Sequence, residues 1–330
     1  MAVTRNLSTV LVRSGLDRLV SRTWRGLLIL NYHRIGTPAP GADPDLYSCG
    51  TEDFERQLDL LAERFEIVPA GSADLTATRP ARRIAITVDD GYADQLGAAR
   101  ALAARGLPGT FFVCTGFVDE PHHAWWDEIA GLLEGPLPAA LPASPWGEAI
   151  TLAGRERQEV RRQVNGLYKQ RAADRGEEFL DWLAAAVGRA RPDRASAAKD
   201  WMSWDDVRTI RDLGMEIGAH TVSHPVLATL DEERQRAEIA GSVERLEEEV
   251  GGIDLFSYPV GARSSFDAVT TRLATEIGIR RSFSFYGGTN DGGCCAHDVR
   301  RAGVFLPHTP EVVVAMATVP GVLASPARHA

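Results

Sequence analysis

Short apolar runs alternate with amphipathic stretches along most of the chain. The runs are rich in β-branched and aromatic residues and end at glycine or polar residues, which is typical of buried strands. Between them, apolar residues recur at helical spacing, as at Phe54, Leu58 and Leu61, which predicts helices with one buried face. The alternation predicts right-handed parallel βαβ units and therefore an α/β fold. The predicted strands are 27–30, 84–88, 110–114, 215–219, 254–258, 281–285 and 302–306, and the predicted helices are 52–64, 94–105, 204–213, 231–249, 266–276 and 310–318.

Two segments depart from this alternation. Residues 1–25 place apolar residues between arginines at helical spacing, which predicts a helix that either packs on the domain or rests on a membrane surface. Residues 119–203 combine a proline-rich patch with charged helical sequence and predict a helical insertion after a strand, where binding sites are commonly built. A structural lid is the alternative. The expected organisation is an N-terminal helix 1–25, one domain 26–320 containing the insertion, and a tail 321–330.

Composition narrows the partners. The formal net charge of −9 over 330 residues argues against nucleic acid as the main partner, because the phosphates of nucleic acids bind to basic surfaces. The four cysteines lack metal-type spacing, which favours reduced thiols in a cytoplasmic protein. No apolar core of signal-peptide length and no span of ~20 apolar residues is visible, so we expect no stable membrane anchor, with peripheral contact through residues 1–25 left open.

Two adjacent carboxylates, Asp89 and Asp90, follow the predicted strand 84–88. Because side chains alternate along a strand, the two cannot share one direction until the chain turns. Asp90 alone would be typical of a helix N-cap, since aspartate is among the preferred capping residues. A second pattern, about 130 residues further on, favours a different role for this pair.

That second pattern contains His220 and His224 just after the predicted strand 215–219. Pro225 disfavours helical backbone at His224, so we expect both histidines in a loop. Two histidines and a carboxylate at strand ends of one sheet form a three-ligand metal site that leaves positions for water. Non-haem iron oxygenases use the same ligand set, but the second carboxylate favours hydrolysis, which needs a base for a metal-bound water.

Three segments together resemble the signature motifs of the polysaccharide deacetylases, carbohydrate esterase family 4. They are Thr87-Val88-Asp89-Asp90-Gly91, His220-Thr221-Val222-Ser223-His224 and Ser257-Tyr258-Pro259-Val260-Gly261. The opening strand with Tyr32-His33 resembles the permuted exopolysaccharide-deacetylase type. The resemblance covers about residues 28–118 and 202–306.

The resemblance implies an irregular seven-stranded (β/α) barrel that removes an acyl group from an amino sugar. Asp89 corresponds to the catalytic base of the family. Asp90, His220 and His224 correspond to the ligands of a divalent metal. Zn²⁺ is the expected ion, and Co²⁺, Ni²⁺ and Fe²⁺ are the alternatives. The implied partner is a carbohydrate, an amino sugar in a polysaccharide, glycolipid or glycoconjugate precursor. The absence of an export signal favours a nucleotide-linked, lipid-linked or otherwise intracellular N-acyl sugar over finished wall polymer.

The third motif departs from the family pattern. An arginine that orients the base usually precedes it, and Ser257 and Val260 stand where the family has other residues. Another arginine must orient the base, and the candidates are Arg280, Arg281, Arg300 and Arg301. Tyr258, Pro259 and Val260 are the expected substrate-binding residues of this motif, because the backbone amide of Val260 suits an oxyanion donor.

The general acid has two candidates. The family places it in a late Leu-x-His motif, which Leu306-Pro307-His308 matches loosely, whereas the permuted type uses an early histidine. We predict His33, because it ends an apolar strand, while proline on both sides of His308 directs that stretch away from the barrel.

The substrate and the reaction stay partly open. Trp125 and Trp126 are predicted to stack on sugar rings, with a buried core role as the alternative. The leading hypothesis is hydrolysis of an N-acetyl or N-formyl group. An O-acetyl esterase, and a sugar-binding protein that has lost catalysis with the motif arginine, are the other two.

Overall fold

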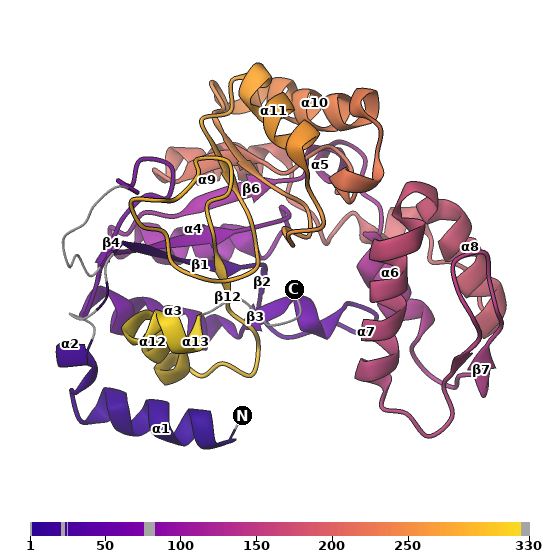
Figure 1. The fold of residues 1–330 in the computed structure, drawn as a ribbon, viewed down its shortest axis with the longest axis horizontal. Helices are drawn as coiled ribbons and strands as arrows, with labels where there is room; N and C mark the ends of the chain where they lie inside the picture. Colours follow the sequence, from indigo (N-terminus) through magenta and orange to yellow (C-terminus); the bar gives the residue numbers. More distant parts are fainter. Residues whose placement is uncertain (1, 21–23, 25, 76–82, 325–330) are drawn as a thin grey trace. The chain divides into compact units, whose positions relative to one another are not determined.

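The computed structural model describes residues 2–20, 24, 26–75 and 83–324. Two compact units are distinguished. The first, here the barrel unit, comprises residues 1–37, 45–119 and 200–330, and the second, the helical unit, comprises residues 38–44 and 120–199 (Figure 1). No helix among the described residues has both the length and the apolar character needed to cross a bilayer.

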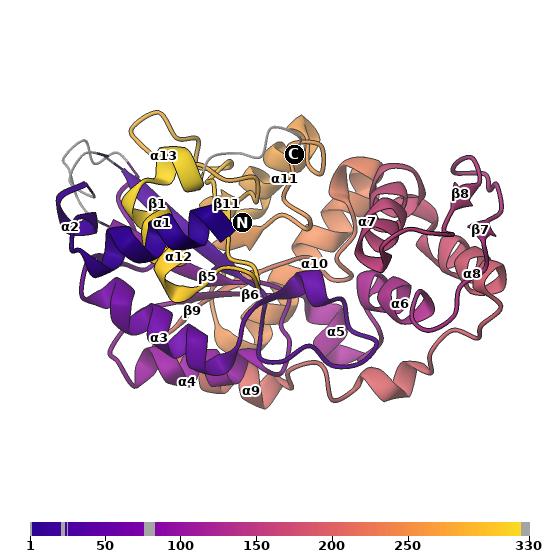
Figure 2. The same ribbon diagram turned by 90° about the horizontal axis from the view of Figure 1, so that it is seen from below.

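A curled parallel sheet organises the barrel unit (Figures 1 and 2). Its strand order is β11-β10-β9-β6-β5-β1-β12, and all seven predicted strands are present. A short strand that the sequence did not predict, β4 (Glu66–Ile67), pairs with the beginning of β5. The seven are β1 (Leu27–Tyr32), β5 (Arg83–Val88), β6 (Thr110–Val113), β9 (Glu216–Ala219), β10 (Leu255–Ser257), β11 (Arg281–Phe283) and β12 (Ala302–Gly303).

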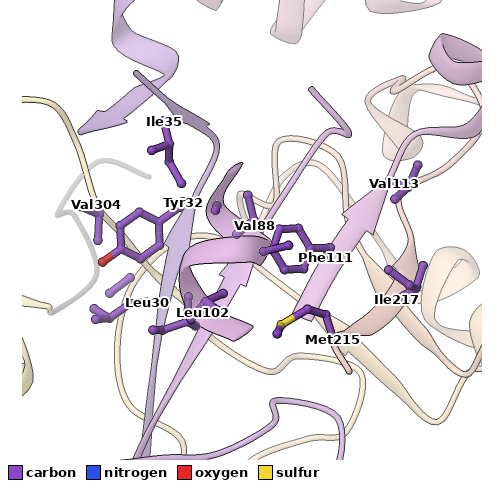
Figure 3. Packing of buried hydrophobic residues seen from close by; sticks show 14 of the residues in the cluster. Leu30, Tyr32, Ile35, Val88, Leu102, Phe111, Val113, Met215, Ile217 and Val304 are labelled. Carbon is purple, nitrogen blue, oxygen red and sulfur yellow. The ribbon is translucent and has the colours of Figure 1, made fainter. Parts of the chain in front are cut away.

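The register of the central strands brings their carboxyl ends together. In β1 and β5, Asn31 is opposite Thr87 and Tyr32 is opposite Val88, while β12 flanks the other side of β1 with Gly303 opposite Asn31. Every residue of β1 is buried, and Tyr32 packs with the other apolar side chains of the core in Figure 3. Burial on both faces explains why these strands are continuous apolar runs in the sequence.

Helices cover the outside of the sheet at the predicted places. The capping boxes at Ser203–Asp206 and Asp267–Thr270 fix where two of them begin. The predicted helices appear as α3 (Thr51–Ala62), α4 (Gln95–Ala103), α9 (Trp204–Asp212), α10 (Glu232–Val250), α11 (Ala268–Ile277) and α12 (Pro310–Thr318). The barrel unit also contains α5 (Thr115–Asp119), α13 (Pro320–Leu323) and a two-stranded pairing of β2 (Arg34–Ile35) with β3 (Tyr47–Cys49).

The predicted N-terminal helix is divided in two. Helix α1 (Ala2–Arg13) ends before Gly15, whose φ of 74° breaks the helical path, and α2 (Asp17–Val20) follows. Helix α1 lies along α12 (Figures 1 and 2). Residues 21–23 and 25 of the predicted helix lie outside the described residues, as do residues 325–330 of the predicted tail.

The helical unit has its own aromatic core. Trp125 and Trp126 are buried, and Trp125 stacks on Tyr168 with ring centroids 4.3 Å apart. The carboxylate of Asp43 joins the loop 38–44 to Arg161 at 2.8 Å. The elements of this unit are α6 (Trp125–Leu132), α7 (Arg157–Leu167), α8 (Gly176–Val187) and the hairpin of β7 (Ala140–Leu141) with β8 (Ile150–Thr151).

Candidate active site

Backbone strain is concentrated in the three motifs. Four non-glycine residues among those described have a positive φ: Asp90 at 89°, Thr221 at 68°, His224 at 56° and Val260 at 65°. Such conformations are uncommon outside glycine, and for a β-branched residue such as Val260 they are true outliers. Strained residues of this kind cluster at functional sites, where the surrounding structure holds them in place.

Asp89 and Asp90 leave the end of β5 in different directions. The N–H of Asp89 continues the pairing with β1 by donating to the carbonyl of Tyr32 at 3.0 Å. At Asp90 the backbone turns to positive φ, and α4 begins only at Gln95, so Asp90 is not a helix N-cap. The turn is what separates the roles of two consecutive carboxylates.

The Asp89 carboxylate is buried in a network of donors. Arg301 binds it with two parallel hydrogen bonds, Nη1 to Oδ1 at 2.7 Å and Nη2 to Oδ2 at 2.8 Å. Asn31 Nδ2 donates to Oδ2 at 3.1 Å, and Ser257 Oγ donates to the same oxygen at 3.3 Å. Paired, charge-assisted bonds of this geometry fix both the position and the ionisation of a carboxylate.

Arg301 is fully buried and has an acceptor for each of its five N–H groups. Besides Asp89, it donates to the carbonyl of Ser284 from Nε at 3.0 Å, to Asn31 Oδ1 from Nη1 at 2.7 Å and to Ser257 Oγ from Nη2 at 2.7 Å. The guanidinium therefore contacts both Asp89 and Ser257, the residue that stands in the third motif where an arginine is usual. Of the four candidate arginines, only this one contacts the base: Arg280 pairs with Asp254 and Arg281 donates to the carbonyl of Ala70.

Burial and charge act in opposite directions on the Asp89 carboxylate. Burial by itself raises its pKa, but the charge and hydrogen bonds of Arg301, with contributions from His220 and His33, hold the pKa of Asp89 well below its usual value. The carboxylate is therefore ionised at neutral pH.

Asp90, His220 and His224 converge on one point. Asp90 Oδ1 lies 3.4 Å from His220 Nε2 and 3.6 Å from His224 Nε2. In the part of the chain that the structure describes, these three form the one group of ligand-type side chains arranged to hold a metal ion. All three side chains are buried, and Asp90 Oδ2 has no hydrogen-bond partner.

The donor atoms fit a divalent metal. His220 Nδ1 lies 2.7 Å from the carbonyl of Ser257, which can only accept, so Nδ1 carries the proton and Nε2 presents its lone pair to Asp90. In the neutral ring, a lone pair facing a carboxylate oxygen needs a cation between them, and either a metal ion or a proton can serve. Burial lowers the pKa of His220, but the hydrogen bond to Asp90 and the charge of Asp89 raise that pKa overall. Ligand atoms of a tetrahedral zinc ion, with bonds of ~2.1 Å, lie about 3.4 Å apart, which matches the two separations at Asp90.

The histidine loop is held by α10. Glu238 accepts from the N–H groups of Val222 and Ser223, both at 2.9 Å, and from Ser223 Oγ at 2.6 Å. Thr221 Oγ1 accepts from the N–H of His224 at 3.0 Å. These bonds compensate the positive φ of Thr221 and His224 and keep both rings aimed at Asp90.

His33 stands beside the base at the end of β1. Its N–H donates to Ser48 Oγ at 3.0 Å, and its ring meets Phe285 edge to face at 5.2 Å. Gln95 donates from Nε2 to the carbonyls of both His33 and Asp89 and so links the two backbones. Burial lowers the pKa of His33, and Asp90 and Asp89 raise it in part.

His308 makes hydrogen bonds within its own turn. Its Nδ1 accepts from the N–H of Phe305 at 3.3 Å, and its own N–H donates to the carbonyl of Phe305 at 2.7 Å, which closes a turn after β12. The ring of Phe305 is exposed, and it lies 6.3 Å from the ring of Phe285. Phe285 therefore stands between His33 and the exposed Phe305.

The third motif contributes backbone rather than side chains. The Tyr258 hydroxyl donates to the carbonyl of His297 at 2.9 Å, and its ring stacks on Phe266 at 4.0 Å. Pro259 is buried, and Val260 is half-buried with its strained φ. Trp125 and Trp126 belong to the helical unit, so the structure does not place them with respect to this site.

Sequence reasoning missed several residues of the network. Asn31, Thr87 and Gln95 are polar residues in buried positions, and polarity inside an otherwise apolar strand was the available signal for Asn31 and Thr87. Thr87 Oγ1 donates to Asn31 Oδ1 at 2.6 Å and so orients the amide toward Asp89. Glu238 lies within a Glu-rich helix and carries no signal of its own.

Comparisons with known proteins agree with this geometry. The profile of the polysaccharide deacetylase family matches residues 76–282. A search of curated proteins found no match. The match ends before Arg301 and begins after His33, so the two residues that flank Asp89 lie outside it.

Solved structures share the fold at low sequence identity. The Streptococcus pyogenes deacetylase PplD, solved with acetate, has a TM-score of 0.57 and 15% identity, covering 89% of this chain and 98% of that one. A polysaccharide deacetylase from Bacillus cereus has a TM-score of 0.56 and 14% identity, covering 89% and 69%. IcaB from Ammonifex degensii has a TM-score of 0.54 and 20% identity, covering 89% and 98%.

Three observations indicate the same family: the seven-stranded parallel sheet, the positions of the motifs, and the profile match over more than half of the chain. The chain belongs to the polysaccharide deacetylase family, carbohydrate esterase family 4.

Proposed function

We propose that the protein is a metal-dependent hydrolase that removes an N-acetyl or N-formyl group from an amino sugar in a polysaccharide, glycolipid or glycoconjugate precursor. One observation carries the proposal: the ionised carboxylate of Asp89, clamped by Arg301, is the chain neighbour of Asp90, on which His220 and His224 converge. A base held beside a ligand set is what hydrolysis by a metal-bound water requires.

Asp90, His220 and His224 would hold the metal, Zn²⁺ or the related Co²⁺, Ni²⁺ or Fe²⁺. When bound, such an ion lowers the pKa of a coordinated water to about 7 and polarises the acyl oxygen. Asp89 accepts the proton of the attacking water. The N–H of Val260 donates to the oxygen on which negative charge develops, and His33 gives a proton to the departing amine nitrogen.

The sugar is proposed to bind along Tyr258, Pro259 and Val260. The ring of Phe285 contacts the rings of both His33 and Phe305. The exposed ring of Phe305 adds an apolar surface suited to one face of a sugar ring. The burial of Trp125 and Trp126 limits the surface that each offers, and their role in stacking stays a prediction. We also propose a cytoplasmic location for the protein. The helical unit is proposed to be an insertion that sets substrate preference.

The alternatives differ in the bond cleaved. An O-acetyl esterase would use the same base and ligands, but its leaving alcohol depends less on a proton donor than an amine does. The third hypothesis, a sugar-binding protein without catalysis, arose from the missing motif arginine, and the contact of Arg301 with Asp89 removes that reason.

The first prediction concerns the reaction. With Zn²⁺ supplied, the protein should release acetate or formate from N-acylated amino sugars, and a chelator should abolish the release. The assay is acid release from a panel of N-acetyl, N-formyl and O-acetyl sugars with and without chelator. Release from O-acetyl sugars alone would favour the esterase, and a metal-loaded protein that binds the panel without releasing acid would favour the lapsed enzyme.

The second prediction separates base from ligand. Asp89→Asn should keep its metal and lose turnover by about 10²–10⁴-fold, because the base acts on the water without holding the ion. Its matched variant Asp90→Asn should lose the metal together with activity. Metal content after dialysis and the rate of acid release distinguish the two. Metal lost from Asp89→Asn and kept in Asp90→Asn would mean that the roles are reversed.

The third prediction concerns Arg301. Its removal in Arg301→Met leaves a buried charge unpaired and should lower the free energy of unfolding at neutral pH by about 3–5 kcal/mol. Because the pKa of Asp89 is depressed in the folded protein, the pair stabilises above the usual aspartate pKa, and this contribution is lost as pH falls. Urea unfolding at neutral and acidic pH measures the difference.

Two further variants test the pairing itself. The double variant Arg301→Met with Asp89→Asn should recover part of the stability, since no buried charge remains. Arg280→Met, which breaks an exposed pair with Asp254, is the control and should cost at most about 1 kcal/mol. A loss in Arg301→Met that Asp89→Asn does not reduce would show that Arg301 supports packing rather than the base.

The fourth prediction compares the two histidines. His33→Ala should lower turnover by about 10²–10⁴-fold with metal content unchanged, because an amine leaves only when it is protonated. His308→Ala should keep turnover close to that of the unmodified protein, because His308 closes a surface turn. Rates of acid release from the same N-acyl substrate decide, and an inactive His308→Ala beside an active His33→Ala would restore the late histidine as the acid.

A further inference from the structure

Exposed apolar side chains gather in one stretch of the barrel unit. Seven large apolar side chains are exposed among the described residues, and four of them lie within residues 7–19. Leu7 is 66% exposed, Val10 63%, Leu16 51% and Leu19 63%. Single exposed apolar residues need no explanation, but a local group of them marks an interaction surface.

Helix α1 presents apolar residues on two sides. Its inner side, with Ser8 and Val12 buried, lies along α12 (Figures 1 and 2). Leu7 and Val10 are three residues apart and therefore share a face, and both are exposed. A helix that only covers a core needs one apolar side, so the second requires another contact.

The same stretch is basic in an acidic protein. Residues 1–25 contain five arginines and one carboxylate, Asp17, while the whole chain has a net charge of −9. Asp17 is buried and paired with Arg64 at 2.7 Å, so its charge does not face solvent. Arg5, Arg13 and Arg18 are exposed, and the contact of Arg18 with Glu63 is long, at 4.0 Å, and exposed on both sides. Such a pair costs little to break.

We propose that α1 and α2 form a peripheral docking surface for an anionic lipid membrane, with Leu7, Val10, Leu16 and Leu19 entering the interface and Arg13 and Arg18 meeting the headgroups. Exposed apolar residues with exposed arginines close to them along a short helical stretch suit a lipid interface. A protein partner is less favoured, because four side chains cover far less than the ~800 Å² that each side of a specific protein interface contributes.

The binding should be reversible and sensitive to salt. A short helix supplies limited apolar area, so the apolar and electrostatic contributions are both needed for measurable affinity. Raising the ionic strength until the Debye length is about 3 Å should release the protein. The surface works whichever acyl sugar the enzyme takes, so the proposal does not depend on the proposed function.

Flotation of the full-length protein with lipid vesicles tests the proposal. The protein should float with phosphatidylcholine vesicles that contain phosphatidylglycerol and much less with phosphatidylcholine alone. The apolar variant Leu7→Ser with Val10→Ser and the charge variant Arg13→Glu with Arg18→Glu should each reduce the partition coefficient at least about tenfold. Val322→Ser, another exposed apolar residue, and Arg100→Glu, another exposed arginine, are the matched controls and should bind as the unmodified protein does.

Thermal unfolding of each variant shows whether the fold is intact. Failure of the unmodified protein to float with anionic vesicles at low salt would overturn the proposal, as would equal losses in the control variants. A dimer in solution that Leu7→Ser with Val10→Ser dissociates, without vesicle binding, would make the surface a contact between copies of this chain instead.

Discussion

The site depends on one buried ion pair, that of Arg301 with Asp89. Burying either charge alone would cost several kcal/mol, and their attraction repays this only when the remaining donors and acceptors are satisfied. Here they are, because Ser284, Asn31 and Ser257 take the other guanidinium hydrogens and Asn31 also donates to the carboxylate. The pair therefore keeps the Asp89 carboxylate ionised and in a fixed position, and we expect both properties to weaken without the arginine.

The order of the strands explains how the two charges meet. Asp89 follows β5 and Arg301 precedes β12, while Asn31 belongs to β1, which lies between these two strands in the sheet. A one-residue shift of register between β1 and β5 would move Asn31 away from Thr87 and turn its side chain to the other face. The chemistry of the site and the register of the sheet are thus one constraint, and the apolar runs that specify the sheet also specify the site.

The sequence predicted the parts of the fold that short-range pattern determines. The seven strands were recognisable because burial on both faces leaves continuous apolar runs, and the helices because their apolar residues repeat at helical spacing. Strand β4 was missed because two residues, Glu66 and Ile67, carry no pattern. The division of the N-terminal helix depends on positive φ at Gly15, which a glycine permits but does not require.

Long-range contacts account for what the sequence left open at the site. Four arginines were candidates to orient the base, and only the strand order brings Arg301, more than two hundred residues along the chain, against Asp89. The positive φ values of Asp90, Thr221, His224 and Val260 were not predictable either, because these residues adopt them only under the constraint of their surroundings. Residue types were enough to propose Asp90, His220 and His224 as metal ligands, whereas the contacts that hold these side chains depend on the topology.

The same topology bears on the source of the proton donor. Strands β1 and β12 are neighbours in the sheet, so a histidine after either one emerges at the same edge, and strand order alone does not choose between His33 and His308. Local bonding does distinguish them. The N–H of Phe305 occupies Nδ1 of His308, whereas Gln95 ties the His33 backbone to that of Asp89 and leaves the His33 ring against Phe285. Gln95 thus holds the backbones of His33 and Asp89 close together, which supports the proposal that one group gives a proton and the other takes one across a single substrate bond.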